Sequence, residues 1–106
     1  MSRFKLIPSI TIENGIVVDD NHEKIEFLDR DPVKVACMYA NNGADELFIV
    51  ERSNNFENYM KNINIMITIS DNIDIPILVY GNIEKNDDIK RYLYTGAKKA
   101  VLAAPC

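Results

Sequence analysis

The side chains best suited to chemistry gather in a polar segment between two apolar stretches. Asp19, Asp20 and Glu23 could offer carboxylate oxygens to a hard metal ion, and His22 lies among them. Charged side chains in a polar loop are usually solvated, so we interpret the three carboxylates as loop charge. We interpret His22 as a surface histidine without a partner. No metal site is predicted here.

A second candidate site is Gly81-Asn82, which follows an apolar strand and precedes a helix start. Backbone N–H groups at a helix N-terminus can bind an anion such as phosphate. A lone glycine is a weak motif, so a simple strand-to-helix turn is the preferred interpretation. Cys37 and Cys106 lie far apart without CxxC spacing, so neither a redox nor a metal centre is predicted. The sequence implies no cofactor.

Strands and helices alternate along the chain that must position these groups. Apolar, β-branched runs predict strands at residues 4–12, 46–51, 75–80 and 99–104, and Asn14-Gly15 predicts a turn. Helices are predicted to begin at the caps Asp31 and Asn54 and at Asn86–Asp88. Helical spacing predicts that the first helix packs through Val33, Cys37 and Ala40, with Ala36 alongside, and the second through Phe56, Met60, Ile63 and Ile67.

This alternation predicts parallel strands joined by right-handed crossovers. Side chains alternate along a strand, so Phe4, Leu6, Ile10 and Ile12 share one apolar face that suits a covering helix. Charged residues at three strand starts favour a barrel interior over a flavodoxin-like sheet. We therefore predict an α/β fold, the parallel βαβαβαβ half of a TIM (β/α)8 barrel, over residues 1–106 as a single half-barrel domain.

Length and charge narrow the class of protein. The 106 residues argue for one domain, and the net charge of −4 with a pI near 4.9 disfavours nucleic acid as a partner. No run approaches the roughly 20 apolar residues that span a bilayer. The N-terminus shows no signal-peptide core, so we expect a cytoplasmic chain with reduced cysteines and no membrane partner.

Five segments, in order and in register, carry a resemblance to a known family: Ile7–Val18, Asp31–Val33, Gly43–Leu47, Ile75–Val79 and Gly96–Lys99. They resemble the first half of the HisA/HisF barrels of histidine biosynthesis. Their spacing fits the cyclase subunits of imidazole glycerol phosphate synthase. The resemblance implies a TIM barrel, and a lyase or cyclase activity for the family's complete members.

The chain departs from that family at its catalytic end. The family's catalytic aspartate at the end of the first strand is Thr11 here, and a hydroxyl does not accept a proton near neutral pH as a carboxylate does. The aspartate ending the second strand is Glu51, and the lysine of the substrate-covering loop is Asp19. The second catalytic aspartate belongs to the other half of the barrel. We therefore predict no catalytic residue.

The family's phosphate loops are also altered. Its Gly-Gly-Gly after the third strand is Tyr80-Gly81-Asn82 here, so two side chains stand where backbone would approach the phosphate. Its Asn-Thr pair after the fourth strand is Ala103-Ala104. At most a weak phosphate site is predicted at Gly81, Asn82, Ala103 and Ala104.

The opposite end matches the family. Lys5, Glu46 and Lys99 stand where charged residues ring the family's N-terminal pore, through which ammonia enters from a glutaminase partner. They could line a gate or dock a glutaminase, although charge satisfaction within one layer of the barrel is the simpler interpretation. In barrels the N-terminal strand ends chiefly carry stability, and the C-terminal ends carry chemistry.

Three functions stay open. The chain could be a degenerate half-barrel that acts as an assembly or binding module and does not catalyse alone. It could be half of a split cyclase completed by another chain, or a truncated relic without a function. The possible partners are a second copy, a glutaminase subunit or a complementary half-barrel.

Self-association is expected from the open sheet. Four strands leave two unpaired edges and one face without helices. We expect that face to expose Ile7, Phe48, Val50, Ile77, Val79 and Val101. A patch of this kind is uncommon on a monomer, which predicts a homodimer or a tetramer.

Overall fold

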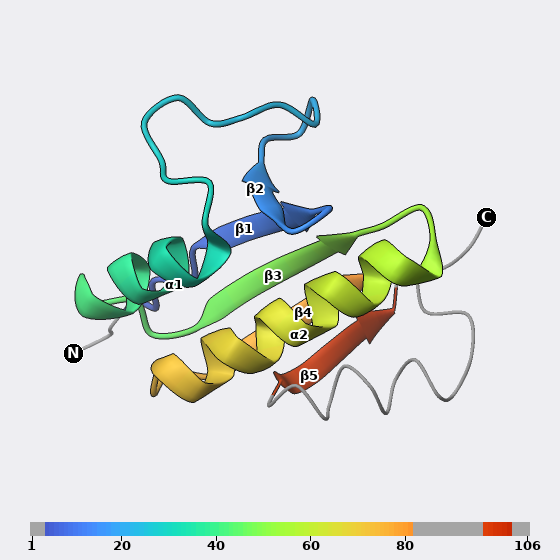
Figure 1. Cartoon of the computed structure of the whole chain (residues 1–106). Coiled ribbons are helices and arrows are strands. Elements are labelled where there is room, and N and C mark those ends of the chain that lie inside the picture. Colours follow the sequence, from blue (N-terminus) through green and yellow to red (C-terminus); the bar gives the residue numbers. More distant parts are fainter. Residues whose placement is uncertain (1–3, 82–96, 103–106) are drawn as a thin grey trace.

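A computed structural model describes residues 4–81 and 97–102, the latter by their backbone. Figure 1 shows the elements in chain order: β1 (Ser9–Glu13), β2 (Ile16–Val18), α1 (Pro32–Asn41), β3 (Leu47–Arg52), α2 (Phe56–Asn72), β4 (Ile77–Gly81) and β5 (Ala97–Leu102). The helix predicted to start at Asn86–Asp88 lies outside the described residues. No described helix is both long enough and apolar enough to cross a membrane.

The sheet has the strand order β2-β1-β3-β4-β5. Four of its strands, β1, β3, β4 and β5, run parallel, which confirms the predicted half of a TIM barrel. The short strand β2 pairs antiparallel with β1 across the turn predicted at Asn14-Gly15. Both turn residues have positive φ, 51° and 86°, as a tight two-residue hairpin requires.

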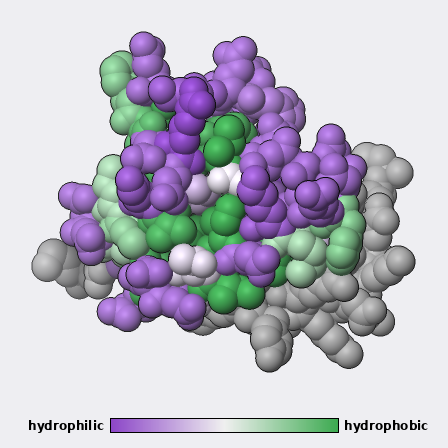
Figure 2. Space-filling model, in the orientation of Figure 1, coloured by the Kyte–Doolittle hydropathy of each residue, from purple (hydrophilic) through white to green (hydrophobic). Residues whose placement is uncertain are grey.

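The core lies between the sheet and the two described helices. Alternate strand residues are buried beneath α1 and α2, namely Ile10, Ile12, Leu47, Ile49, Ile77 and Val79. Val35 and Ala36 of α1 and Met66 and Ile69 of α2 join the same cluster. The two helices therefore cover one face of the sheet (Figure 1). On this helical side, hydrophilic residues cover much of the surface, with hydrophobic patches between them (Figure 2).

The prediction for the first strand is partly wrong. Ile10 and Ile12 are buried as expected, but Phe4 and Leu6 are 90% and 59% exposed, and the strand begins at Ser9. Pro8 has no N–H for a ladder, which explains the late start. Pro8 itself still contacts β3, since Phe48 N donates to Pro8 O at 2.9 Å.

The face predicted for Ile77 and Val79 is also wrong. Parallel register pairs them with Leu47 and Ile49, so they lie under the helices and are 1% and 0% exposed. The other face of β4 carries Leu78 and Tyr80, beside Phe48 and Val50. Both faces of this strand are apolar, so alternation in the sequence gives no information on which side points inward.

The open face is the sheet surface that neither described helix covers. It is defined by Thr11, Phe48, Val50, Leu78 and Tyr80, which share one side of the sheet by register. All are partly buried except Tyr80, which is 37% exposed. Phe48 and Tyr80 stack with ring centroids 6.4 Å apart.

Helix starts match the prediction closely and helix faces less well. Asp31 caps α1 by accepting from Val33 N at 2.9 Å, as predicted. The buried face of α1 is Pro32, Val35 and Ala36, of which Ala36 was predicted beside the stripe. The predicted Val33, Cys37 and Ala40 lie at the margin of this face.

The cap of α2 is Asn55 rather than Asn54, because the Asn55 side chain accepts from Asn58 N at 2.8 Å. Of the predicted stripe only Ile63 is fully buried, and Phe56 is 64% exposed. The stripe was misplaced because α2 buries a polar residue, Asn62, at its centre.

Candidate functional site

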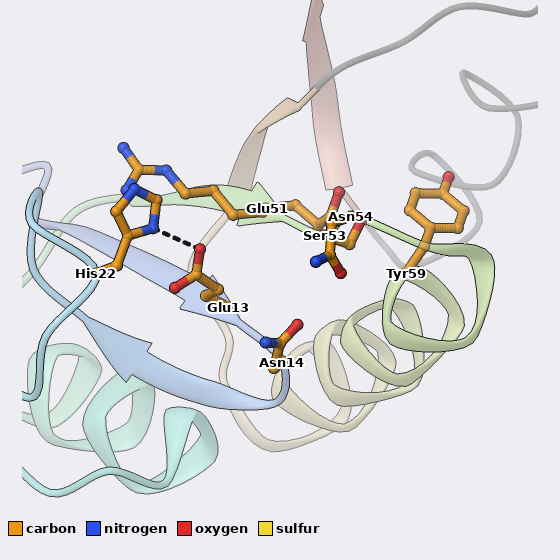
Figure 3. Close-up of a pocket in the computed structure, with 8 residues that line it drawn as sticks. Glu13, Asn14, His22, Glu51, Ser53, Asn54 and Tyr59 are labelled. Carbon is orange, nitrogen blue, oxygen red and sulfur yellow. Dashed lines mark hydrogen bonds and ion pairs between the residues drawn. The ribbon is translucent and has the colours of Figure 1, made fainter.

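A hollow lies where β1 and β3 end. It encloses about 430 Å³ and is lined by Glu13, Asn14, His22, Glu51, Arg52, Ser53, Asn54 and Tyr59. These residues come from the ends of β1 and β3, the β1–β2 turn, the loop after β2, the loop after β3 and the first turn of α2 (Figure 3). Active sites of barrels are built at this end of the strands, so the hollow stands in the position of a ligand site.

Asn62 holds the segments that line this hollow in place through its buried side chain. Its side chain is fully buried, and its Nδ2 donates to Glu51 Oε2 and to the Arg52 carbonyl, each at 2.9 Å. Its Oδ1 accepts from Gly15 N at 2.9 Å. One amide thus ties α2 to the end of β3 and to the β1–β2 turn.

Gly15 suits that turn because its φ is +86°, a conformation that residues with a Cβ rarely adopt. The hydrogen bond from Gly15 to Asn62 was not predicted from the sequence. The one hint in the sequence is Asn62 itself, a polar residue on a helix face whose other positions, such as Tyr59 and Ile63, are apolar.

The interpretation of His22 as a histidine without a partner is wrong. Its Nδ1 lies 2.6 Å from Glu13 Oε1, and Figure 3 shows the two side chains pointing toward each other. His22 has φ +65° in the loop after β2, which turns its ring back toward the sheet. Asp19 Oδ1 shapes that loop by accepting from Asn21 N and Glu23 N at 2.8 and 3.0 Å.

Arg52 was missed by sequence reasoning although it lines the hollow. It follows Phe48 and Val50 along the open face, and its register partner on β1 is Glu13. The Nη1 atom of Arg52 is buried and has no hydrogen-bond partner among the described residues. Its position at the end of an alternating strand was the available signal.

The residues predicted to replace the family's catalytic groups are separated by the fold. Thr11 lies on the open face, in register with Val50, and is partly buried. Glu51 is in register with Ile12 on the helical face, where it is 6% exposed and bound by Asn62. Their side chains therefore start from opposite faces of the sheet.

Only part of the predicted phosphate site can be placed. Gly81 is the last residue of β4 and is buried. Asn82, Ala103 and Ala104 lie outside the described residues. That site stays a prediction.

The opposite end of the sheet brings two of the three predicted charges together. Lys5 Nζ lies 3.9 Å from Glu46 Oε2, with side chains 67% and 14% exposed. Lys99 lies in β5, in backbone register with Leu78. An apolar hollow of about 380 Å³ lies beside Lys5, lined by Leu6, Ile7, Pro8, Tyr39, Asn42 and Ala44.

Comparisons with known proteins agree with this architecture. The sequence pattern of a family described as histidine biosynthesis protein matches residues 5–105. Imidazole glycerol phosphate synthase subunit HisF of Halalkalibacterium halodurans is 32% identical over 92% of this chain and 39% of its own length. The Flavobacterium psychrophilum subunit is 35% identical over 90% of this chain and 38% of its own length.

A third relative is an imidazole-4-carboxamide isomerase of Bacillus licheniformis, 28% identical over 98% of this chain and 44% of its own length. The chain thus spans about two fifths of the length of the curated relatives that it matches. The matched portion corresponds to the first half of the family's barrels, which the five segments of the sequence resemble.

Proposed function

This chain belongs to the histidine biosynthesis protein family, and from that premise we propose that it acts as a non-catalytic assembly module whose open face closes against a second half-barrel. The observation that carries the proposal is the contrast between Thr11 and Glu51. Neither offers a free carboxylate on the open face, because Thr11 has none and Glu51 lies on the helical face against Asn62.

The replacement of the family's aspartate by Thr11 supports a non-catalytic role. Proton transfer requires a group within hydrogen-bond reach of the reacting atom. The remaining carboxylate at this end, Glu13, is paired with His22 at 2.6 Å. A hydroxyl at Thr11 can orient a ligand but cannot act as the acid/base group of the family.

The open face supports an assembly role. Phe48, Val50, Leu78 and Tyr80 give it an apolar centre, and burying such surface contributes roughly 25 cal/mol per Å² before the entropy of association. The occupant that we propose is a second copy, because two sets of four parallel strands make the eight of a barrel. A tetramer could form from two such dimers.

The edge of β1 limits how the barrel can close. β2 already pairs with Thr11, Ile12 and Glu13, so the outer edge is free only before Thr11. That stretch carries exposed Phe4, Leu6 and Ile7. A strand of the second copy would pair there, and Lys5 with Glu46 would then lie in the ring of charge at the same end. A glutaminase subunit could dock on that ring, and we expect the assembly in the cytoplasm.

Two measurements test this proposal. The purified chain should not cyclise the family's substrate with ammonia above a no-enzyme control, and Thr11→Asp alone should not restore turnover. Turnover that survives repurification would contradict the non-catalytic role.

Native mass spectrometry of the chain, alone and after co-expression with the products of neighbouring genes, identifies the occupant. We expect homodimers or tetramers from the chain alone. A complex formed only with a complementary half-barrel would replace the second copy by that chain and reopen the split-enzyme function.

A further inference from the structure

Arg52 and Glu13 are neighbours that do not pair. They are register partners on adjacent parallel strands, so their side chains leave the same face of the sheet. A guanidinium and a carboxylate in such positions would ordinarily form an ion pair. Here Glu13 is engaged instead by His22, with Nδ1 and Oε1 2.6 Å apart.

Glu51, the second carboxylate of the hollow, is also hydrogen-bonded within the chain. Glu51 Oε2 accepts from Asn62 Nδ2 at 2.9 Å, and the side chain starts from the face opposite to Arg52. Arg52 forms no ion pair with the described residues, and its Nη1 is buried without a hydrogen-bond partner among them. A buried donor without an acceptor costs about 1–3 kcal/mol, and more when it is charged.

We propose that the hollow at the ends of β1 and β3 binds a small monocarboxylate, with Arg52 as its anchor and the His22–Glu13 pair keeping the anchor free. The volume of about 430 Å³ lies in the range of small-molecule sites. A guanidinium presents parallel N–H groups that match the two oxygens of a carboxylate. Asn14, Ser53 and Asn54 line the same space and can hydrogen-bond the rest of the ligand.

Charge favours a monocarboxylate over a phosphate. The lining holds one guanidinium and two carboxylates, Glu13 and Glu51. These charges sum to a net negative lining, so the net repulsion is about twice as large for a dianion as for a monoanion, while Arg52 gives either ligand one cation to bind. Gly81, the one described residue of the predicted phosphate site, does not line this hollow.

His22 is a positioning residue in this proposal. It does not anchor the ligand, but it holds the Glu13 carboxylate away from Arg52. Without His22, Glu13 can turn to its register partner and compete with the ligand. Without the Glu13 charge, the ligand meets less repulsion. The two substitutions should therefore change affinity in opposite directions.

NMR titration of the full chain with propionate, inorganic phosphate and ethylammonium tests the ligand class. Propionate should shift amide signals of residues 13–14 and 51–54 saturably. Phosphate and ethylammonium should bind there at least about tenfold more weakly. Equal or tighter binding of phosphate, or no saturable response to propionate, would overturn the proposal.

Variants of the same chain test the anchor. Arg52→Gln should weaken propionate binding at least about tenfold, and Arg52→Lys should restore only part of it. Lys34→Gln removes an exposed cation on α1, outside the hollow, and should leave affinity unchanged. His22→Ala should weaken binding and Glu13→Gln should strengthen it. Unchanged affinity in Arg52→Gln, or the same direction in both pair variants, would contradict the assignment.

Discussion

Both faces of the sheet carry apolar side chains, but these side chains are buried to different degrees. On the helical face Ile12, Ile49 and Val79 are each 0% exposed, because α1 and α2 seal them. On the open face Phe48 and Val50 stay partly buried, and Tyr80 is 37% exposed. In the part of the chain that the structure describes, helices cover one face of the sheet and not the other, and this difference is the basis of the proposed assembly.

The largest expected difference between the two faces is in the free energy of unfolding when neighbouring residues on β3 are shortened. Ile49→Ala should lower the free energy of unfolding by about 3 kcal/mol, because it leaves a cavity beneath both helices. Val50→Ala should cost less than about 1 kcal/mol in dilute protein, since its side chain is only partly buried in the single chain. Urea unfolding at low protein concentration measures both, and equal losses would break the comparison.

A smaller effect is expected at Asn62, the polar centre of the helical face. Asn62→Ala should cost about 2 kcal/mol, because Gly15 N and the Glu51 carboxylate each lose a hydrogen bond to Asn62 in a partly or fully buried place. Asn64→Ala, on the exposed side of the same helix, is the matched control and should stay within about 0.5 kcal/mol. A loss at Asn62 no larger than at Asn64 would show that this amide does not hold the strand ends.

The smallest effect is expected at the charged end. Lys5→Gln should change the free energy of unfolding by less than about 1 kcal/mol, because Lys5 is 67% exposed and its ion pair with Glu46 is open to solvent. Thermal unfolding at low and high salt checks this. A larger, salt-sensitive loss that appears only in the assembled protein would show that the pair lies at an interface.

Local signals in the sequence predicted local structure well. Asp31-Pro32 predicted the start of α1, and Asn14-Gly15 predicted the turn that begins β2, because each depends on backbone geometry over a few residues. Alternating strands and helices predicted the parallel sheet, and charged residues at three strand starts together with the family resemblance predicted the half-barrel. The faces of β4 could not be predicted, since Ile77, Leu78, Val79 and Tyr80 are all apolar and only the register separates them.

The site was harder to predict because its residues are distant in the chain. Glu13, His22 and Arg52 come from β1, a loop and β3, and their grouping depends on a positive φ at His22 and on the parallel register. Asn62 reaches Gly15 from 47 residues away. No spacing rule along the chain encodes such contacts, whereas the loss of the family's aspartate at Thr11 is visible in the sequence itself.

Sedimentation equilibrium from low to high micromolar protein tests directly whether the open face closes against a second copy of the chain. The unmodified chain should sediment as a dimer or tetramer, and Phe48→Asp, which places a charge on the open face, should sediment as a folded monomer. Phe27→Asp makes the same exchange at a side chain that is 94% exposed in the loop before α1, and it should leave the assembly intact. An unmodified chain that stays a stable, folded monomer at high micromolar concentration would contradict the account.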